Sequence, residues 1–390
     1  MEEKKKIQIT RISLIALIAV VILAIGILSV ILLGGKEETK PQENIIENKE
    51  ENTQIEEPTK PEEPEIAKDP LPQIALNTIA KENATINGKV PCYYNPVIPK
   101  GFKAIGSMQD STITMEANWE QQNGYLNGLV IEDEKGNQFV WIPVENMELF
   151  HTTDWQKNMP KESIDKTYVE PAGNEKEEYT NMYQKVRKYG GFYVGRFEVG
   201  DAEAKTARTE VKNSDNMAIK KGLQVYDYVP FEQTTIHKRE IIGAKELAIK
   251  FGKTNQYENI TTSVMYGVQW DSMLRFLAGD KYNVNDSLTW GNYPNATLEY
   301  KDLQGNTYEK PQGEARLLLT GSSENTKAKN IYDVAGNVYE WTTETAGNNV
   351  RVVRGGCYMV TIGQLAATRY AYNAATANNA IGFRISFCIN

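Results

Sequence analysis

Histidine and cysteine are scarce in this chain of 390 residues. It has two histidines, His151 and His237, and three cysteines, Cys92, Cys357 and Cys388, at irregular spacing. Two histidines exclude a metal centre built on a histidine triad. Three cysteines are too few for a four-cysteine zinc site or for a scaffold stapled by several disulfides. Whatever the chain does, its sequence offers little for chemistry at a zinc or histidine-bound iron site.

The chain also lacks an excess of positive charge. Its formal net charge is −8, and residues 37–69, with twelve acidic and four basic side chains, account for all of it. The remainder is balanced, so it offers no electrostatic footprint for nucleic acid. The acidic segment is interrupted by prolines and has few apolar side chains to offset the entropy of ordering. Residues 34–72 are therefore predicted to form a disordered, extended stalk.

One long apolar run lies near the N-terminus. Residues 12–33 carry no charge, and a helix of that length spans ~33 Å, enough to cross the core of a bilayer. A cleaved signal peptide is the alternative, but its apolar region is usually about 7 to 15 residues long and ends at a small-residue cleavage site. Basic residues precede the run and acidic residues follow it. The pattern predicts a cytoplasmic tip at 1–11 and a single-pass anchor in the cell membrane, with the C-terminal domain outside.

Beyond the stalk, the sequence predicts an α+β fold. Residues 128–144 hold two apolar runs around a Glu-Lys-Gly-Asn turn, which is typical of a hairpin. Residues 190–200 favour a strand, whereas 239–251 and 268–277 have the apolar spacing of helices. The polar residues 152–183, between the hairpin and the strand at 190–200, are interpreted as a surface insertion.

The C-terminal third is rich in Asn, Gly, Thr and Tyr and has short apolar runs. These runs predict short strands joined by long loops, at residues 315–321, 330–344, 350–360 and 381–387. Two helices followed by an irregular antiparallel region make an α+β arrangement.

Several of these stretches occur in the order found in the sulfatase-modifying factor, or formylglycine-generating-enzyme, domain family, which the chain therefore resembles. The motifs are FVWIPV (139–144), GGFYVGRFEVG (190–200), YGVQWDSMLRFL (266–277), NIYDVAGNVYEW (330–341), VRGGCY (353–358) and IGFRISF (381–387). The resemblance covers roughly residues 129–388 and implies a C-type-lectin-like fold. Residues 129–390 are then the family domain, and 73–128 are an N-terminal extension of it.

The resemblance implies a structural calcium ion in the stretch DVAGNVYEW. Carried over residue by residue, Asp333 and Glu340 would supply side-chain oxygens, and Gly336 and Val338 would supply main-chain carbonyls. A hard cation prefers several oxygens, and a glycine permits the turn that collects them. The alternative is that Asp333 only caps a turn and that Glu340 pairs with an arginine or a main-chain amide.

The resemblance does not extend to the family's catalytic thiols. The family's oxidases use two cysteines shortly after an Arg-Gly-Gly motif to bind copper and to oxidise a substrate cysteine with oxygen. Val360 and Leu365 stand at those positions, and neither side chain can bind a metal or exchange electrons. Cys357 is a single thiol, which is more often a buried apolar residue than a nucleophile. Cys357 and Cys388 could instead form a disulfide. No copper and no catalysis of the family's known kinds are expected.

The stretch AYNAATANNA, residues 371–380, uses only Ala, Asn, Thr and Tyr and runs directly into Gly-Phe-Arg. C-type-lectin-like folds include the variable proteins of diversity-generating retroelements, which vary exposed residues just before such a motif. Replacing adenines in AAC codons yields the same four residue types. The alternative is a fixed loop that binds a ligand or is merely structural. Tyrosine and asparagine are common in binding loops because rigid aromatic area and adaptable hydrogen bonds favour contact.

The sequence therefore predicts a non-catalytic binding protein of the cell surface. Its partner would be a surface macromolecule or a carbohydrate rather than nucleic acid. Arg354, Arg369 and Arg384 are expected to hold the scaffold through carboxylate or carbonyl bonds. An enzyme with an unrecognised site and an envelope structural component are the alternatives. The predicted ligand-binding residues are Tyr358, Thr361, Gln364, Tyr370, Tyr372, Asn373, Thr376, Asn378 and Asn379.

Overall fold

A computed structural model describes residues 82–85, 90–108, 110–113, 118–119, 121, 123–155, 159–160, 168–170, 175–278, 282–361 and 365–390. All of them fall in one compact unit, Lys68–Asn390. The predicted tip, anchor and stalk lie outside the described residues. Among the helices that are described, none is both long and apolar enough to cross a bilayer.

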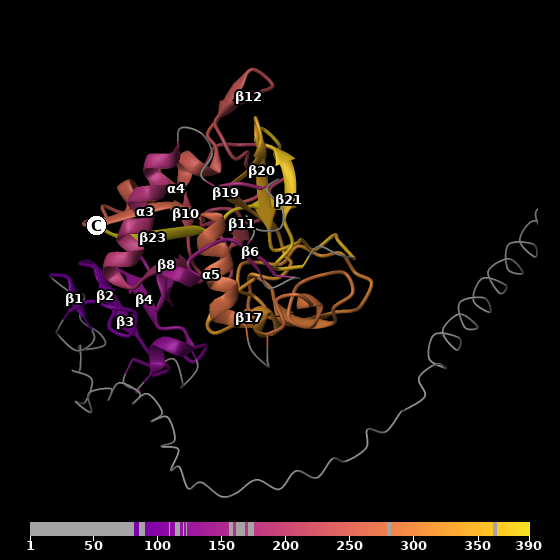
Figure 1. The fold of residues 1–390 in the computed structure, drawn as a ribbon. Coiled ribbons are helices and arrows are strands. Elements are labelled where there is room, and N and C mark those ends of the chain that lie inside the picture. The colour runs from indigo at the N-terminus through magenta and orange to yellow at the C-terminus, as the bar shows by residue number, and fades with distance from the viewer. Residues whose placement is uncertain are drawn as a thin grey trace, which may run out of the picture. The chain divides into compact units, whose positions relative to one another are not determined.

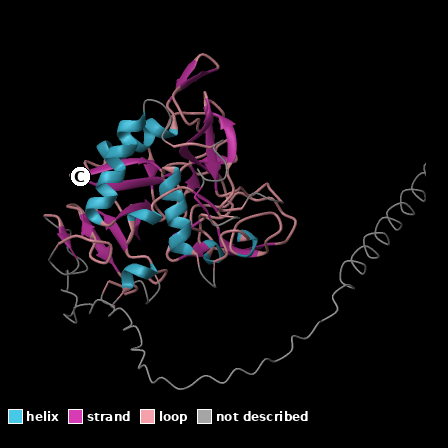
Figure 2. Cartoon of the chain, in the orientation of Figure 1, coloured by secondary structure: helices cyan, strands magenta, loops and turns pink. Residues whose placement is uncertain are grey.

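A six-stranded antiparallel sheet forms the centre of the unit (Figures 1 and 2), with strand order β14-β23-β8-β5-β4-β3. Its strands are β3 (Phe102–Ile105), β4 (Val130–Asp133), β5 (Gln138–Pro143), β8 (Gly191–Gly195), β14 (Ile260–Val264) and β23 (Ile385–Ile389). The predicted hairpin over 128–144 is confirmed as β4 and β5. The last strand of the chain pairs with β8 and β14, so segments distant in sequence close the sheet.

Apolar side chains project from both faces of this sheet, and helices cover both faces. On β5, Phe139 and Trp141 belong to one core cluster, which includes side chains of helix α4 (Ala244–Thr254). Val140 and Ile142 belong to a second cluster, which includes side chains of α3 (Lys176–Tyr189) and α5 (Gly267–Leu277). Successive residues of a strand point to opposite faces, so a continuous apolar run is what a doubly covered strand requires.

The described residues contain three α-helices, one more than the two predicted. Helices α4 and α5 confirm the predictions for 239–251 and 268–277, apart from their boundaries. Helix α3 was not predicted. Its first half lies in the polar stretch interpreted as a surface insertion, and most of residues 176–183 are exposed. Tyr179, Met182, Tyr183 and Val186 have helical spacing, but polar residues between them and charged residues on either side conceal it.

A second sheet, of four strands, carries the C-terminal motifs in the order β21-β20-β19-β22. Its strands are β19 (Tyr339–Gly347), β20 (Val350–Arg354), β21 (Tyr370–Asn373) and β22 (Ile381–Gly382). Helix α5 contacts both β5 and β19, so it lies between the two sheets. Residues 370–373, expected to be a loop, are therefore an edge strand of this sheet.

The remaining strands are short and form local pairs, apart from one three-stranded sheet with the order β10-β9-β11. They are β1 (Ala84–Thr85), β2 (Val97–Ile98), β6 (Thr153–Asp154), β7 (Met159–Pro160), β9 (Gly200–Asp201), β10 (Met217–Ala218), β11 (Gln224–Val225), β12 (Thr234–Ile236), β13 (Arg239–Ile241), β15 (Leu298–Lys301), β16 (Thr307–Lys310), β17 (Lys327–Ala328) and β18 (Ile331–Tyr332). Residues 315–319 are irregular, so the strand predicted at 315–321 is not formed. There, backbone groups bond to side chains instead, as when the amide of Leu318 donates to Asn337 Oδ1.

Candidate binding surface

Strand β21 brings two of the predicted ligand-binding residues together. Tyr370 and Tyr372 are two residues apart on one strand, so they share a face, and their ring centroids are 4.9 Å apart. Tyr370 also stacks on buried Tyr339 at 6.2 Å, and Tyr372 meets Trp341 edge-on at 6.5 Å. Tyr370 is 41% exposed, whereas Tyr372 is half-buried. The outer ring is thus supported from beneath by a rigid aromatic stack.

The turn after β21 uses its asparagines mainly for its own structure. Asn373 Oδ1 accepts from the amide of Ala375, and Asn378 Oδ1 accepts from the amide of Ala380, each at 2.9 Å. Asn379 Nδ2 donates to the hydroxyl of Tyr358 at 3.0 Å. Side-chain bonds to amides two residues ahead are the usual role of Asn in turns. These bonds fix the loop, so its composition need not mean that every asparagine faces a ligand.

The other predicted ligand-binding residues are spread around this strand. Tyr358 is largely buried, Thr376 is half-buried, and Thr361 is exposed, with its carbonyl accepting from Asn295. Gln364 lies outside the described residues. Tyr370, with Tyr372 beside it, is therefore the most prominent aromatic feature of the predicted set.

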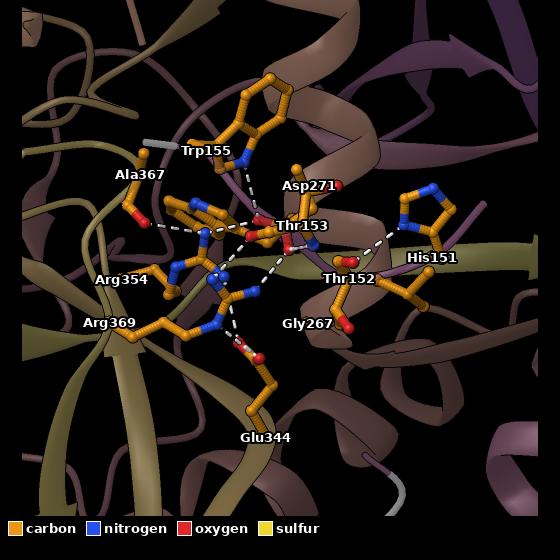
Figure 3. A network of polar contacts seen from close by, with 12 residues as sticks. His151, Thr152, Thr153, Trp155, Gly267, Asp271, Glu344, Arg354, Ala367 and Arg369 are labelled. Carbon is orange, nitrogen blue, oxygen red and sulfur yellow. Dashed lines mark hydrogen bonds and ion pairs between the residues drawn. The ribbon is translucent and has the colours of Figure 1, made fainter. Parts of the chain in front are cut away.

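Arg369, immediately before β21, anchors the strand in a buried network of four charges (Figure 3). Its guanidinium contacts Glu344 Oε1 at 2.7 Å and Asp271 Oδ2 at 2.5 Å. Arg354, at the end of β20, contacts Asp271 Oδ1 at 2.6 Å and Glu344 Oε2 at 3.0 Å. The charges of the two arginines and the two carboxylates cancel. Buried charges of this kind are stable in the interior only when they are paired and well hydrogen-bonded.

Further donors complete the shell around Asp271. Trp155 Nε1 and the amide of Thr153 donate to its two oxygens at 3.0 and 2.8 Å. Burial alone would raise the pKa of Asp271, but Arg354 and Arg369 outweigh it, so the pKa lies below its ordinary value. The carboxylates in turn raise the pKa of Arg369, against the effect of burial. The contact between Arg369 and Asp271 at the base of β21 therefore favours the charged form of both groups.

The roles predicted for the three arginines are confirmed. Arg354 and Arg369 bind the network just described, and Arg384 binds Glu340 and two main-chain carbonyls. Sequence reasoning did not find their partners Asp271 and Glu344. Asp271 lies next to Trp270 on α5, and Glu344 lies among threonines on β19. A buried acid indicates a partner elsewhere in the chain, but the residues around it do not show which one.

The four residues carried over for calcium lie beside a second buried charge cluster. Both oxygens of Asp333 accept bonds from the chain, from Gly321 N at 2.6 Å and Thr326 Oγ1 at 2.7 Å. Glu340 pairs with Arg384, with a shortest contact of 2.6 Å. Both arrangements match the alternative considered for these residues. As arranged, the side-chain oxygens of Asp333 and Glu340 accept from donors of the chain itself.

Glu198 completes this cluster and was not singled out from the sequence. It accepts from Asn337 Nδ2 at 2.7 Å and from the amide of Val338. Burial, together with the charges of Asp333 and Glu340, raises its pKa well above the ordinary value. Burial also raises the pKa values of Asp333 and Glu340. Across the described part of the chain, no group of three or more acidic, histidine or cysteine side chains is arranged to hold a metal.

The cysteines are free thiols, so the disulfide considered between Cys357 and Cys388 is not formed. Both are buried, and burial raises the pKa of Cys357 above its ordinary value and that of Cys388 to about 12. A thiol with a raised pKa stays protonated at neutral pH and is a poor nucleophile. Val360 and Leu365, which were predicted to replace the family's cysteines, are half-buried, and Val360 packs against the core.

Comparisons with known proteins bear on the C-terminal half of this arrangement. Residues 265–387 match the model of the FGE-sulfatase family, described as a sulfatase-modifying factor enzyme 1-like domain. A search of curated proteins finds no match.

Two solved structures share limited similarity with the chain. The structure titled "Crystal Structure of CarF" is 16% identical, covers 51% of this chain and 87% of its own, and has a TM-score of 0.30. Treponema denticola variable protein 1 is 12% identical, covers 52% of this chain and 85% of its own, and has a TM-score of 0.29. The family resemblance drawn from the motifs is thus confirmed where the family model matches: over residues 265–387, the chain is similar to the sulfatase-modifying factor enzyme 1-like domain.

Proposed function

We propose that this protein is a non-catalytic binding protein whose ligand contacts strand β21 and the turn that follows it. The observation that carries the proposal is the tyrosine pair on β21. Tyr370 is exposed, Tyr339 supports it from below, and Arg369 fixes the strand through two buried ion pairs. A rigid aromatic side chain on a preorganised strand adds contact area at a small cost in conformational entropy.

The chemistry of the neighbouring residues favours contact over catalysis. The positions of the family's two cysteines hold Val360 and Leu365, which can neither bind copper nor carry electrons. Cys357, the nearest thiol in sequence, is buried, and its pKa is raised by that burial. We therefore propose that a C-type-lectin-like scaffold is used here to present a binding surface, to a carbohydrate or to a macromolecule of the cell surface.

The sequence before the folded unit suggests where this surface is displayed. An uncharged run at 12–33, with basic residues before it and acidic residues after it, supports a single-pass anchor with the folded unit outside the cell. The acidic stalk would hold the unit away from the membrane. Diversification of residues 371–380 would add variable specificity. A near-copy of the gene's 3′ end that differs at adenines, beside a reverse transcriptase gene, would support that part of the proposal.

Tyrosine-to-alanine substitutions on β21 test the binding surface. In the full chain held in lipid nanodiscs, Tyr370→Ala and Tyr372→Ala should each weaken capture of a cell-surface partner about tenfold or more, because aromatic anchors dominate interfaces of this kind. Tyr308→Ala is the matched control, since Tyr308 is also exposed, at 47%, but lies on β16. The surface is wrongly assigned if both β21 variants melt like the wild type and capture the partner as strongly.

Calcium, which the family resemblance implies, is a prediction with its own test. If an ion is bound through Asp333 and Glu340, calcium should raise the melting temperature and a chelator should lower it. Since Arg384 already supplies positive charge to this cluster, we expect the two melting temperatures to agree within about 2 °C. A larger stabilisation that Glu340→Gln abolishes would establish a calcium site.

A further inference from the structure

A cavity lies along the free edge of the main sheet, and no role has been assigned to it. Strand β14 is the edge strand, and its residues 260–264 line a cavity of ≈ 490 Å³ together with side chains of α3 and α4. Helix α3 belongs to the core cluster on one face of the sheet and α4 to the cluster on the other face. Figure 1 shows both helices close to β23, the neighbour of β14. This volume is typical of a site for a small molecule.

The lining is largely apolar. Met182 comes from α3, Ile249 from α4, and Ile260 and Val264 from β14, while the thiol of Cys388 comes from β23. Ile249 is 37% exposed, so a large aliphatic side chain stands partly open to solvent at the cavity. Such a surface gains free energy when an apolar group covers it.

Three lysines stand among these apolar side chains. Lys245 is neutralised by Glu175 at 2.7 Å and by Glu178 at 3.2 Å. Lys185 differs, because its ammonium donates to the hydroxyl of Thr261 at 2.7 Å and forms no ion pair with any carboxylate of the described residues. Burial lowers its pKa, the direction expected for an ammonium that has lost water without gaining an anion. Lys253 adds a third cation to the lining.

We infer that this cavity binds a small amphiphilic carboxylate, with its acyl or aryl part on the apolar side chains and its carboxylate on Lys185. An anion there would supply the missing counter-charge and form a charge-assisted hydrogen bond. The cavity would repel a cation with the same apolar tail. The reason is that its lining holds three lysines, Lys185, Lys245 and Lys253, and one acidic side chain, Glu178. This site is separate from β21 and does not depend on the function proposed for that strand.

Hydrogen–deuterium exchange on the full chain tests the site with decanoate as the probe. A local readout is chosen because decanoate also enters the lipid that carries the full chain. Saturating decanoate should slow amide exchange in α3, α4 and β14, whereas decyltrimethylammonium, with the same tail and the opposite charge, should not. Lys185→Met should raise the decanoate concentration needed for half protection about tenfold, the effect of one lost charged hydrogen bond.

Two further variants keep the test decisive. Lys188→Met is the matched control, because Lys188 lies on the same helix but does not line the cavity; its half-protection concentration should equal that of the wild type. Ile249→Glu places a negative charge at a partly exposed lining position and should weaken decanoate as Lys185→Met does. The inference is overturned if decanoate gives no saturable protection, if Lys185→Met and Lys188→Met behave alike, or if decyltrimethylammonium protects equally well.

Discussion

The two buried charge clusters differ in how their charges balance. Beneath β21, Asp271 and Glu344 face Arg354 and Arg369, and the pKa of Asp271 is lowered. Beside the DVAGNVYEW stretch, three buried carboxylates lie around one buried guanidinium, that of Arg384, and the pKa of each carboxyl group is raised.

Both clusters are buried, so burial alone does not explain the difference. The number of cations does, because each additional guanidinium offsets the cost of removing a carboxylate from water. In the balanced cluster, the lowered pKa of Asp271 keeps this carboxylate charged for its contacts with Arg354 and Arg369. The acid-rich cluster should hold at least one proton, and its stability should depend on pH.

The largest expected effect is the loss of the single arginine in the acid-rich cluster. Arg384→Met leaves Glu340 buried without its cation and removes donors from the carbonyls of Gly195 and Tyr332. We expect the free energy of unfolding to fall by about 3–5 kcal/mol, the usual cost of breaking a buried pair by removing one partner. Urea unfolding of wild type and variant measures it. A loss no larger than that of Arg369→Met would contradict the contrast between the clusters.

A smaller loss is expected in the balanced cluster. After Arg369→Met, Arg354 still contacts both Asp271 and Glu344, so the loss should be about 2–3 kcal/mol. Because Arg369 precedes β21, partner capture should weaken as well. Arg369→Lys keeps the charge and should recover most of the stability but less of the capture, since one ammonium cannot reproduce the forked contacts. Unchanged capture by a folded Arg369→Met protein would separate the network from the binding surface.

The smallest effect is the change in the free energy of unfolding when the pH changes by a single unit. The pKa of Glu198 is higher in the native state than in the unfolded chain, so the native state retains a proton that the unfolded state releases. The resulting stability is complete below the ordinary glutamic acid pKa and is lost as pH rises towards the raised value, by up to ~1.4 kcal/mol per pH unit.

Glu198→Gln should reduce this dependence of the free energy of unfolding on pH. Glu170, whose pKa is raised to about 8 by burial and by the charge of Glu344, contributes a similar slope in both proteins. The quantity to compare is therefore the difference between wild type and variant in urea unfolding from about pH 5 to pH 8. Parallel curves would show that Glu198 is ionised in the native state.

Local patterns were sufficient for much of the fold. Alternation around a Glu-Lys-Gly-Asn turn predicted the β4–β5 hairpin, and apolar spacing predicted α4 and α5, because these elements follow from residues close in sequence. Helix α3 was missed because its apolar stripe is embedded in charged residues. Strand β21 was missed because four residues of YAYN become a strand only by pairing with β20.

The sequence by itself determined the class of the protein: an α+β unit whose C-terminal motifs resemble those of a known family. Only the tertiary structure decided which charges meet. Asp271, Glu344, Arg354 and Arg369 come from four separate segments, and a charge inside an apolar pattern does not specify its partner. Tertiary packing likewise decided that Tyr370, rather than Tyr372, is the more exposed ring. Both rings lie on one face of the strand, and the exposure of each depends on which neighbours cover it.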